Sequence, residues 1–149
     1  MKLFAAVFCL LFTAIGASSQ TTPEDSVKTA IGKYFTSIRN SDGIAFRQSF
    51  ADSSTYININ RDASGEPVVR AAPIVDMALL ISSMAKGMAD PRISFDMVKV
   101  NGSLASAWVP FKFYVNEQQL YCSIASFQMI RKKGVWKILY YIDRQVKCE

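Results

Sequence analysis

The 149-residue sequence contains no histidine. This absence excludes histidine as a general acid or base, the histidine-dependent serine and cysteine triads, and most zinc sites. Cysteine is also scarce, and Cys122 and Cys148 do not have the spacing of a metal-binding pair. No glycine-rich phosphate loop is present, because Gly65 and Gly87 stand alone. The sequence therefore predicts neither a metal nor a cofactor.

Long apolar runs are confined to the start of the chain. Lys2 supplies a positive charge, residues 3–15 an apolar segment, and residues 16–19 small side chains, which is the pattern of a secretory signal peptide. The apolar segment is shorter than the ~20 residues that a comfortable membrane span needs. We therefore predict a signal peptide over residues 1–19, cleaved before Gln20, and a periplasmic or secreted protein without membrane attachment. The alternative is a retained N-terminal anchor.

Charge is moderately basic and scattered, with 17 lysines and arginines against 12 acidic residues. Only residues 131–133 form a basic cluster, at a predicted hairpin tip, where a solvated turn is expected. This pattern does not predict a nucleic-acid partner. Residues 20–149 are long enough to bury a core of their own and are predicted to form a single domain.

The first half of the chain is predicted to be mainly helical. Thr22 is suited to cap a helix that begins at Pro23, with acidic residues in its first turn, and this helix ends near Asn40. The elements that follow are two short strands and two further helices. Their predicted ranges are helix 44–50, strands 54–60 and 67–71, and helix 74–86.

The last third is predicted to be a meander of long strands. Asn101-Gly102 and Lys133-Gly134 predict tight turns, because two-residue hairpin loops need positive φ angles, and the polar segment 116–119 supplies another break. The predicted strands are 93–100, 103–115, 120–132 and 135–146. Strands of this length without an intervening helix predict one strongly curved antiparallel sheet.

Uninterrupted alternation from the turns places Ser126 opposite Tyr141 and predicts two faces. One face mixes apolar with polar groups and is expected to line a pocket: Val109, Phe111, Phe113, Cys122, Ile124, Ser126, Gln128, Leu139, Tyr141 and Asp143. The other is mainly aromatic or apolar and includes Trp108, Tyr114, Phe127, Met129, Ile138, Tyr140 and Ile142. A shift of one residue in the pairing of the strands would exchange the two faces.

Export permits a disulfide between Cys122 and Cys148. In this register, however, Cys148 lies opposite Gln119, and the two cysteines point to opposite faces of the sheet. A bridge then requires the C-terminal tail to leave the sheet and fold back. The sequence leaves both outcomes open.

The order of elements, together with several short segments, resembles the nuclear-transport-factor-2-like superfamily, and more narrowly its exported bacterial branch named for lumazine binding. The segments that carry the likeness are residues 50–53, 107–116, 121–122, 126–128, 133–138 and 142–144. The resemblance implies an α+β cone, in which a curved sheet wraps around the N-terminal helices and encloses a pocket. It also implies a homodimer across the outer sheet face, through Trp108, Phe127 and Tyr140.

Steroid delta-isomerase, an enzyme of this superfamily, offers a comparison residue by residue. Tyr34 falls at the position of its catalytic tyrosine, Asn58 at that of its aspartate base, and Ser126 at that of its oxyanion acid. An asparagine cannot take a proton from carbon at neutral pH, and serine is a weaker donor than a neutral carboxylic acid. The resemblance therefore argues against this isomerase chemistry.

Three functions stay open, of which a non-catalytic small-molecule-binding domain is favoured. Its pocket, for an apolar or aromatic ligand, would be lined by Tyr34, Asn58, Phe111, Phe113, Ser126, Gln128 and Tyr141. The second is a lyase or isomerase acting on a small apolar or cyclic substrate, with Asp143 as base and Tyr34 as donor. The alternative interpretation of Asp143 is an aspartate at the rim of the pocket that pairs with Arg144, Arg47 or a helix N-terminus. The third is a structural dimer whose cone is packed shut.

Overall fold

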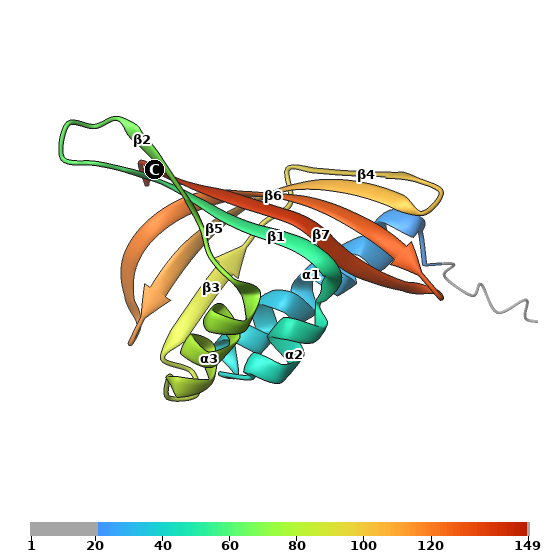
Figure 1. Ribbon diagram of the computed structural model, residues 1–149, viewed down its shortest axis with the longest axis horizontal. Helices are drawn as coiled ribbons and strands as arrows, with labels where there is room; N and C mark the ends of the chain where they lie inside the picture. Colours follow the sequence, from blue (N-terminus) through green and yellow to red (C-terminus); the bar gives the residue numbers. More distant parts are fainter. Residues whose placement is uncertain (1–20, 149) are drawn as a thin grey trace, which may run out of the picture.

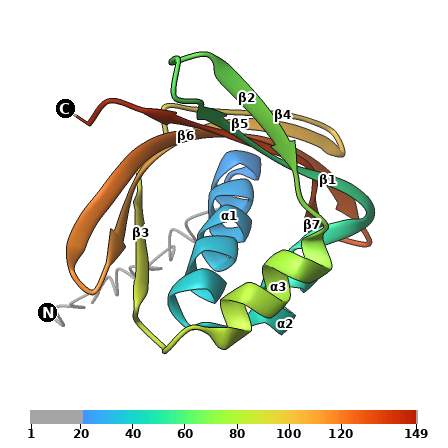
Figure 2. The ribbon, with the colours of Figure 1, turned by 60° about the vertical axis from the view of Figure 1, so that its left-hand side comes forward.

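The computed structural model describes residues 21–148, so the predicted signal peptide lies outside the described residues. Within them, a strongly curved sheet wraps around α1, with α2 and α3 beside it (Figures 1 and 2). The helices are α1 (Pro23–Arg39), α2 (Gly43–Gln48) and α3 (Ile74–Ser83). The strands are β1 (Phe50–Arg61), β2 (Pro67–Ala71), β3 (Ala89–Ile93), β4 (Met97–Asn101), β5 (Leu104–Val115), β6 (Gln118–Lys132) and β7 (Val135–Val146). The predicted α+β cone is confirmed.

The strands follow the order β2-β1-β7-β6-β5-β3, and β4 also pairs with β5. The pair β1–β7 is parallel, whereas the other pairs are antiparallel. The single strand predicted over residues 93–100 is in fact two strands. The pairing changes by one residue between Ile93, opposite Phe111, and Met97, opposite Trp108, which divides the segment.

Helix α1 begins where the sequence predicted. The Thr22 hydroxyl accepts a hydrogen bond from the Asp25 backbone N–H at 3.1 Å, and the Asp25 carboxylate accepts one from the Thr22 N–H at 3.4 Å. This reciprocal capping satisfies two backbone donors that the first turn leaves unpaired. One face of α1 is buried against the sheet through Val27, Ile31, Tyr34, Phe35 and Ile38.

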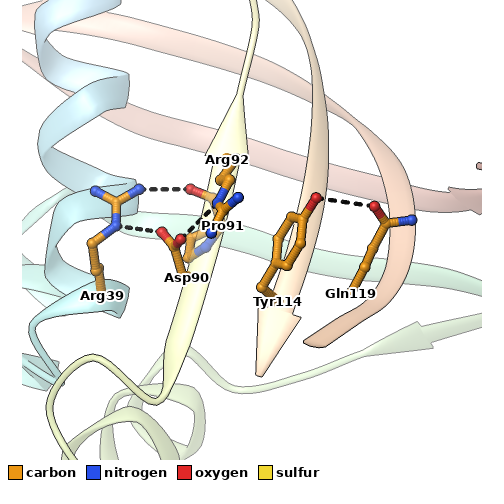
Figure 3. Close-up of polar contacts among 6 residues, drawn as sticks. All are labelled: Arg39, Asp90, Pro91, Arg92, Tyr114 and Gln119. Carbon is orange, nitrogen blue, oxygen red and sulfur yellow. Dashed lines mark hydrogen bonds and ion pairs between the residues drawn. The ribbon is translucent and has the colours of Figure 1, made fainter. Parts of the chain in front are cut away.

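Polar contacts attach the end of α1 to the edge strand β3 (Figure 3). Asp90 accepts from Arg39 Nε at 2.7 Å and from Arg92 Nε at 2.8 Å. Arg39 also donates to the Pro91 carbonyl oxygen at 2.8 Å. The Arg92 guanidinium lies 4.0 Å from the centre of the Tyr114 ring, which links β3 to β5. These contacts fix the helix against one edge of the sheet.

Aromatic rings fill the space between α1 and the concave sheet face. Tyr34 is 1% exposed, and its ring centre lies 5.6 Å from those of both Phe127 and Tyr141. Tyr141 in turn stacks on Tyr56 at 4.6 Å. The other buried rings of this core are Phe35, Phe46, Phe50, Phe111 and Trp136.

The predicted alternation fails in β7 because of a bulge. The turn before this strand is confirmed, and pairing is regular up to Ile138, which lies opposite Met129. The next pair joins Tyr140 to Gln128, so Leu139 has no partner. An unpaired residue of this kind reverses the direction of every side chain that follows.

A second irregularity lies between β5 and β6. Positive φ angles of 48° at Asn116 and 66° at Glu117 place the turn at these two residues, one residue earlier than predicted. Leu120 is then left out of the pairing between Gln119 and Tyr121. The register from Tyr121 onward consequently differs by one residue from the predicted one.

These changes reverse the two faces of β6. Phe127 and Met129 point into the core, where they are 0% and 1% exposed. Ser126 lies opposite Ile142 rather than Tyr141, and Gln128 accepts a hydrogen bond from Ser106 at 2.7 Å. The predictions that Ser126 and Gln128 line the interior and that Phe127 lies outside are wrong, because both assumed an uninterrupted alternation.

The disulfide that the sequence left open is formed between Cys122 and Cys148, with an S–S distance of 2.10 Å. Strand β7 ends at Val146, which pairs with Cys122. The tail then leaves the sheet and turns back to the neighbouring strand, as the bridge was expected to require. Cys122 belongs to the outer face, and its predicted inward direction is wrong for the same reason as that of Ser126.

Candidate functional site

The predicted interior acid, Asp143, lies on β7 near the end of the strand. It pairs directly with Asn58 of the parallel strand β1 and with Ala125 of β6. Only 6% of Asp143 is exposed, which supports the prediction that its side chain points inward. The prediction placed it across from Ile124, and the bulge in β7 explains the difference of one residue.

The two carboxylate oxygens of Asp143 accept hydrogen bonds from neutral groups. Asn58 Nδ2 donates to Oδ1, and Ser123 Oγ donates to Oδ2 at 3.1 Å. We call Asn58, Ser123 and Asp143 the Asp143 cluster. Within residues 21–148, no ion pair joins Asp143 to Arg144, Arg47 or any other cation. The cluster therefore holds a buried carboxyl group on the concave side of the sheet without a compensating positive charge.

Burial raises the pKa of Asp143 above its ordinary value, because desolvation disfavours the charged form. Hydrogen bonds from Asn58 and Ser123 act in the opposite direction, since they stabilise the carboxylate. The described residues contain no group of three or more histidine, cysteine, aspartate or glutamate side chains that could hold a metal ion. The cluster is thus a hydrogen-bonding site with a protonatable centre.

A group of buried tyrosines adjoins the cluster. Tyr56 lies two residues before Asn58 on β1, and its ring centre lies 4.6 Å from that of Tyr141, which in turn lies 5.6 Å from that of Tyr34. Burial raises the pKa of Tyr56 to about 12 and places those of Tyr34 and Tyr141 well above their ordinary value. All these phenols are neutral at physiological pH and connect the core of the cone to Asp143.

Two predicted aromatic residues, Phe111 and Phe113, differ in their exposure. Phe111 is buried and packs against Phe35 of α1, with ring centres 5.5 Å apart. Phe113 is half-buried and stacks on Tyr121, with ring centres 5.0 Å apart and an angle of 6° between the rings. Tyr121 lies two residues before Ser123 in a regularly paired part of β6, so both side chains point to the same face and the ring pair lies beside the cluster.

The structure therefore unites most of the predicted site residues and excludes two of them. Tyr34, Asn58, Phe111, Phe113, Tyr141 and Asp143 belong to the concave side of the sheet. Ser126 and Gln128 do not, because they lie on the outer face. Ser123 was missed, since the predicted register turned it outward, and only the two bulges bring it to Asp143.

The outer face keeps part of its predicted aromatic surface. Trp108 is 44% exposed and Tyr140 is 40% exposed, whereas Phe127 belongs to the core. Trp108 and Ile142 both pair with Ser126, so they lie on either side of one small residue. This face remains the predicted dimer surface, without Phe127.

No protein-family model matches the chain, and no curated protein matches it either. Solved structures do match. One is an NTF2-like protein of unknown function from Shewanella baltica, with a TM-score of 0.62 and 15% identity, over 83% of this chain and 93% of that one. Another is an NTF2-like protein with a cystatin-like fold from Novosphingobium aromaticivorans, with a TM-score of 0.64 and 13% identity, over 84% and 82%.

A third match is a domain of unknown function with a cystatin-like fold from Nostoc punctiforme. Its TM-score is 0.64 and its identity 14%, over 86% of this chain and 80% of that one. Likeness at these identities shows a shared fold and carries no function with it. The chain has the NTF2-like fold, that is, the fold of the nuclear-transport-factor-2-like superfamily.

Proposed function

We propose that the protein is an exported, non-catalytic domain that binds a small ring-containing molecule at the Asp143 cluster. The observation that carries this proposal is a buried carboxyl group whose side-chain hydrogen-bond partners, among residues 21–148, are neutral. We further propose that the protein belongs to the exported bacterial branch of the superfamily that is named for lumazine binding, and that it is periplasmic or secreted.

The chemistry around Asp143 suits a ligand with a hydrogen-bond donor. An ionised carboxylate accepts about four hydrogen bonds, and the side chains of Asn58 and Ser123 supply two. The half-buried Phe113–Tyr121 stack provides a flat apolar wall nearby. Small-molecule sites commonly combine such a wall with a few fixed polar groups. A planar ring bearing an N–H or O–H group fits both features.

Binding is favoured over catalysis by the position of Tyr34, the proton donor of the alternative lyase or isomerase. Its side chain is 1% exposed and is surrounded by the rings of Phe35, Phe46, Phe50, Phe127 and Tyr141. A general acid must come within hydrogen-bonding distance of the substrate. A substrate could meet the Tyr34 hydroxyl only after these rings had moved apart.

The raised pKa of Asp143 is the observation that favours the alternative, because a general base works best when its pKa is close to the operating pH. In that reaction class, Asp143→Asn would lower turnover of an identified substrate by roughly 100-fold or more. In a binding domain without catalysis, the same substitution would change the affinity for the ligand, and no turnover would be measured for either protein.

Two further features support the export and assembly parts of the proposal. The Cys122–Cys148 disulfide is of the kind that persists in oxidising compartments. Trp108 and Tyr140 leave aromatic surface exposed on the outer sheet face. Exposed apolar patches commonly mark protein interfaces, and we propose a homodimer through this face.

The test is a native mass spectrum of the protein after export from its own signal peptide, compared with a denatured spectrum. We expect extra mass on the native species that disappears on denaturation, and that is reduced in Asp143→Asn but kept in Asp96→Asn, an exposed control. A bare native protein at every concentration would contradict the proposal and favour the structural role with a closed cone. The same spectrum reports whether the protein is a dimer.

A further inference from the structure

A groove outside the cone lies between α2, α3, the start of β1 and the β6–β7 turn. Helices α2 and α3 lie side by side at this end of the molecule (Figures 1 and 2). The groove has a volume of about 690 Å³, within the range of roughly 300–1,000 Å³ that is typical of small-molecule sites. Its lining includes no residue of the Asp143 cluster.

The floor of the groove is apolar, although it faces solvent. Ile44 is 73% exposed and Leu79 is 66% exposed, and both are large aliphatic side chains. Other apolar residues of the lining include Phe50, Val75, Ile130 and Val135. Two helices and a hairpin contribute aliphatic side chains that stay exposed to water, which is unfavourable in free energy. Exposed apolar patches of this kind commonly mark binding sites.

The helical wall of the groove is fixed before any ligand arrives. Gly43, at the start of α2, lies so close to α3 that a Cβ atom there would stand 2.1 Å from the Ala78 carbonyl oxygen and 2.2 Å from Ser82 Oγ. Asp42 caps the helix by accepting from the Ala45 N–H at 2.8 Å. The backbones of the two helices therefore approach closely at Gly43, and the groove is preformed.

The rim of the groove is positively charged. Its lining includes Arg47, Lys132, Lys133 and Lys137 against one acidic residue, Asp52. Within the part of the chain that the structure describes, none of these cations takes part in an ion pair. Lys137 donates to the Gln48 carbonyl oxygen. An apolar floor beside an excess of positive charge is complementary to a molecule with an apolar body and an anionic head.

We propose that this groove binds an amphipathic anion, namely a small molecule with an aliphatic chain and a single carboxylate or phosphate head. The chain lies along Ile44 and Leu79, and the head lies near Lys132. A groove of this volume accommodates a single aliphatic chain, whereas an anionic membrane surface would be met by a protruding apolar ridge. The proposal concerns a second site and does not depend on the Asp143 cluster.

Isothermal titration calorimetry with decanoate tests the proposal, using decyltrimethylammonium and decyl maltoside as probes with the same chain and a positive or neutral head. All are used below their critical micelle concentrations. We expect decanoate to bind at least about tenfold more tightly than either, a difference of about 1.4 kcal/mol. Its affinity is expected to fall as salt rises, because the rim charges are exposed and screened.

Two matched pairs of variants locate the site. Leu79→Ser is expected to weaken decanoate binding about tenfold, whereas Leu80→Ser, on an exposed residue of the same helix outside the lining, leaves it unchanged. Lys132→Glu is expected to weaken it to a similar extent, whereas Lys99→Glu, an exposed residue on β4, does not. Circular dichroism checks that each variant is folded.

Three results would overturn the proposal. One is equal binding of the three probes, which would mean that the charge of the head is not recognised. Another is an equal effect of each variant and its control, which would place decanoate elsewhere. The last is binding to phosphatidylglycerol vesicles without binding of monomeric decanoate, which would assign the surface to a membrane instead.

Discussion

The direction of Phe127 provides the sharpest test of how this sheet is built. Uninterrupted alternation places Phe127 on the outer face with Trp108, whereas the structure buries it completely. Its ring centre lies 5.1 Å from that of Tyr141, 5.6 Å from that of Tyr34 and 6.0 Å from that of Phe35, each in an edge-to-face arrangement. Phe127→Ala would open a cavity between α1 and the sheet.

The expected loss of stability follows from this environment. Replacing a fully buried phenylalanine by alanine costs about 3–5 kcal/mol. Edge-to-face aromatic pairs contribute about 0.5–1.5 kcal/mol each beyond the buried area, which places Phe127→Ala in the upper half of that range. Domains of this size have unfolding free energies of about 5–15 kcal/mol, so the loss is a large fraction of the total. Trp108→Ala, at a half-exposed site, should cost about 1 kcal/mol or less.

Urea unfolding followed by far-ultraviolet circular dichroism, with the disulfide intact, measures both variants by linear extrapolation. If Phe127→Ala does not fold, Phe127→Leu provides a milder change with an expected loss of about 1–1.5 kcal/mol. The reasoning fails if Phe127→Ala costs less than about 1 kcal/mol, or less than Trp108→Ala. Either result would mean that the outer-face assignment of Phe127 was right and that the bulge at Leu139 is absent.

Three further changes test the charges and the tail. Because the pKa of Asp143 is raised, its contribution to stability is fully present below the unfolded pKa of about 3.9 and is lost as pH rises through the folded pKa. Urea midpoints should therefore show Asp143→Asn gaining stability relative to the native sequence between pH 4 and pH 8; a constant difference would refute this. Asp90 has a lowered pKa, caused by hydrogen bonds from Arg92 and then Arg39, so its contribution is present above about 3.9 and is lost as pH falls through the folded pKa. Asp90→Asn should cost about 1 kcal/mol at pH 7 and less near pH 3, and an equal cost at both would contradict the ion pairs. Cys148→Ser, which opens a loop with a sequence separation of 26, should lower the free energy of unfolding by about 3–4 kcal/mol; addition of a reductant should have the same effect on the native protein and none on the variant.

Part of the proposed site could be predicted from the sequence. Phe113 was placed correctly on the concave side by alternation, because the pairing of β5 with β6 is regular from Leu104 to Phe113. Asn58 was placed there through the resemblance to the isomerase, and the irregular pairing of β1 with β7 before Thr55 did not affect that assignment. Asp143 was also placed correctly, but two serines of β6 were not. Ser123 was turned outward and Ser126 inward, since the shift between β5 and β6 cannot be seen in a pattern of period two.

The groove between α2, α3 and the β6–β7 turn was not predicted at all. Its residues come from two helices and three strands, and none of these elements shows an unusual local pattern. Leu79 and Ile44 look like ordinary positions of amphipathic helices. Only the packing of α2 on α3 at Gly43 leaves both of them exposed beside Lys132.

The order of helices and strands could be predicted from the sequence, apart from the division into β3 and β4. The cap at Thr22 and the turn at Lys133-Gly134 could also be predicted, as could the cone, through the resemblance to a family. These features follow from contacts among residues that are close along the chain, where capping groups, positive φ angles and periodicity act directly. The bulges at Leu120 and Leu139, the burial of Phe127 and the closure of the Cys122–Cys148 bridge depend instead on packing between distant parts of the chain. A curved sheet must fit around a helix of fixed size, and the pairing shifts where the packing of aromatic rings on that helix requires it.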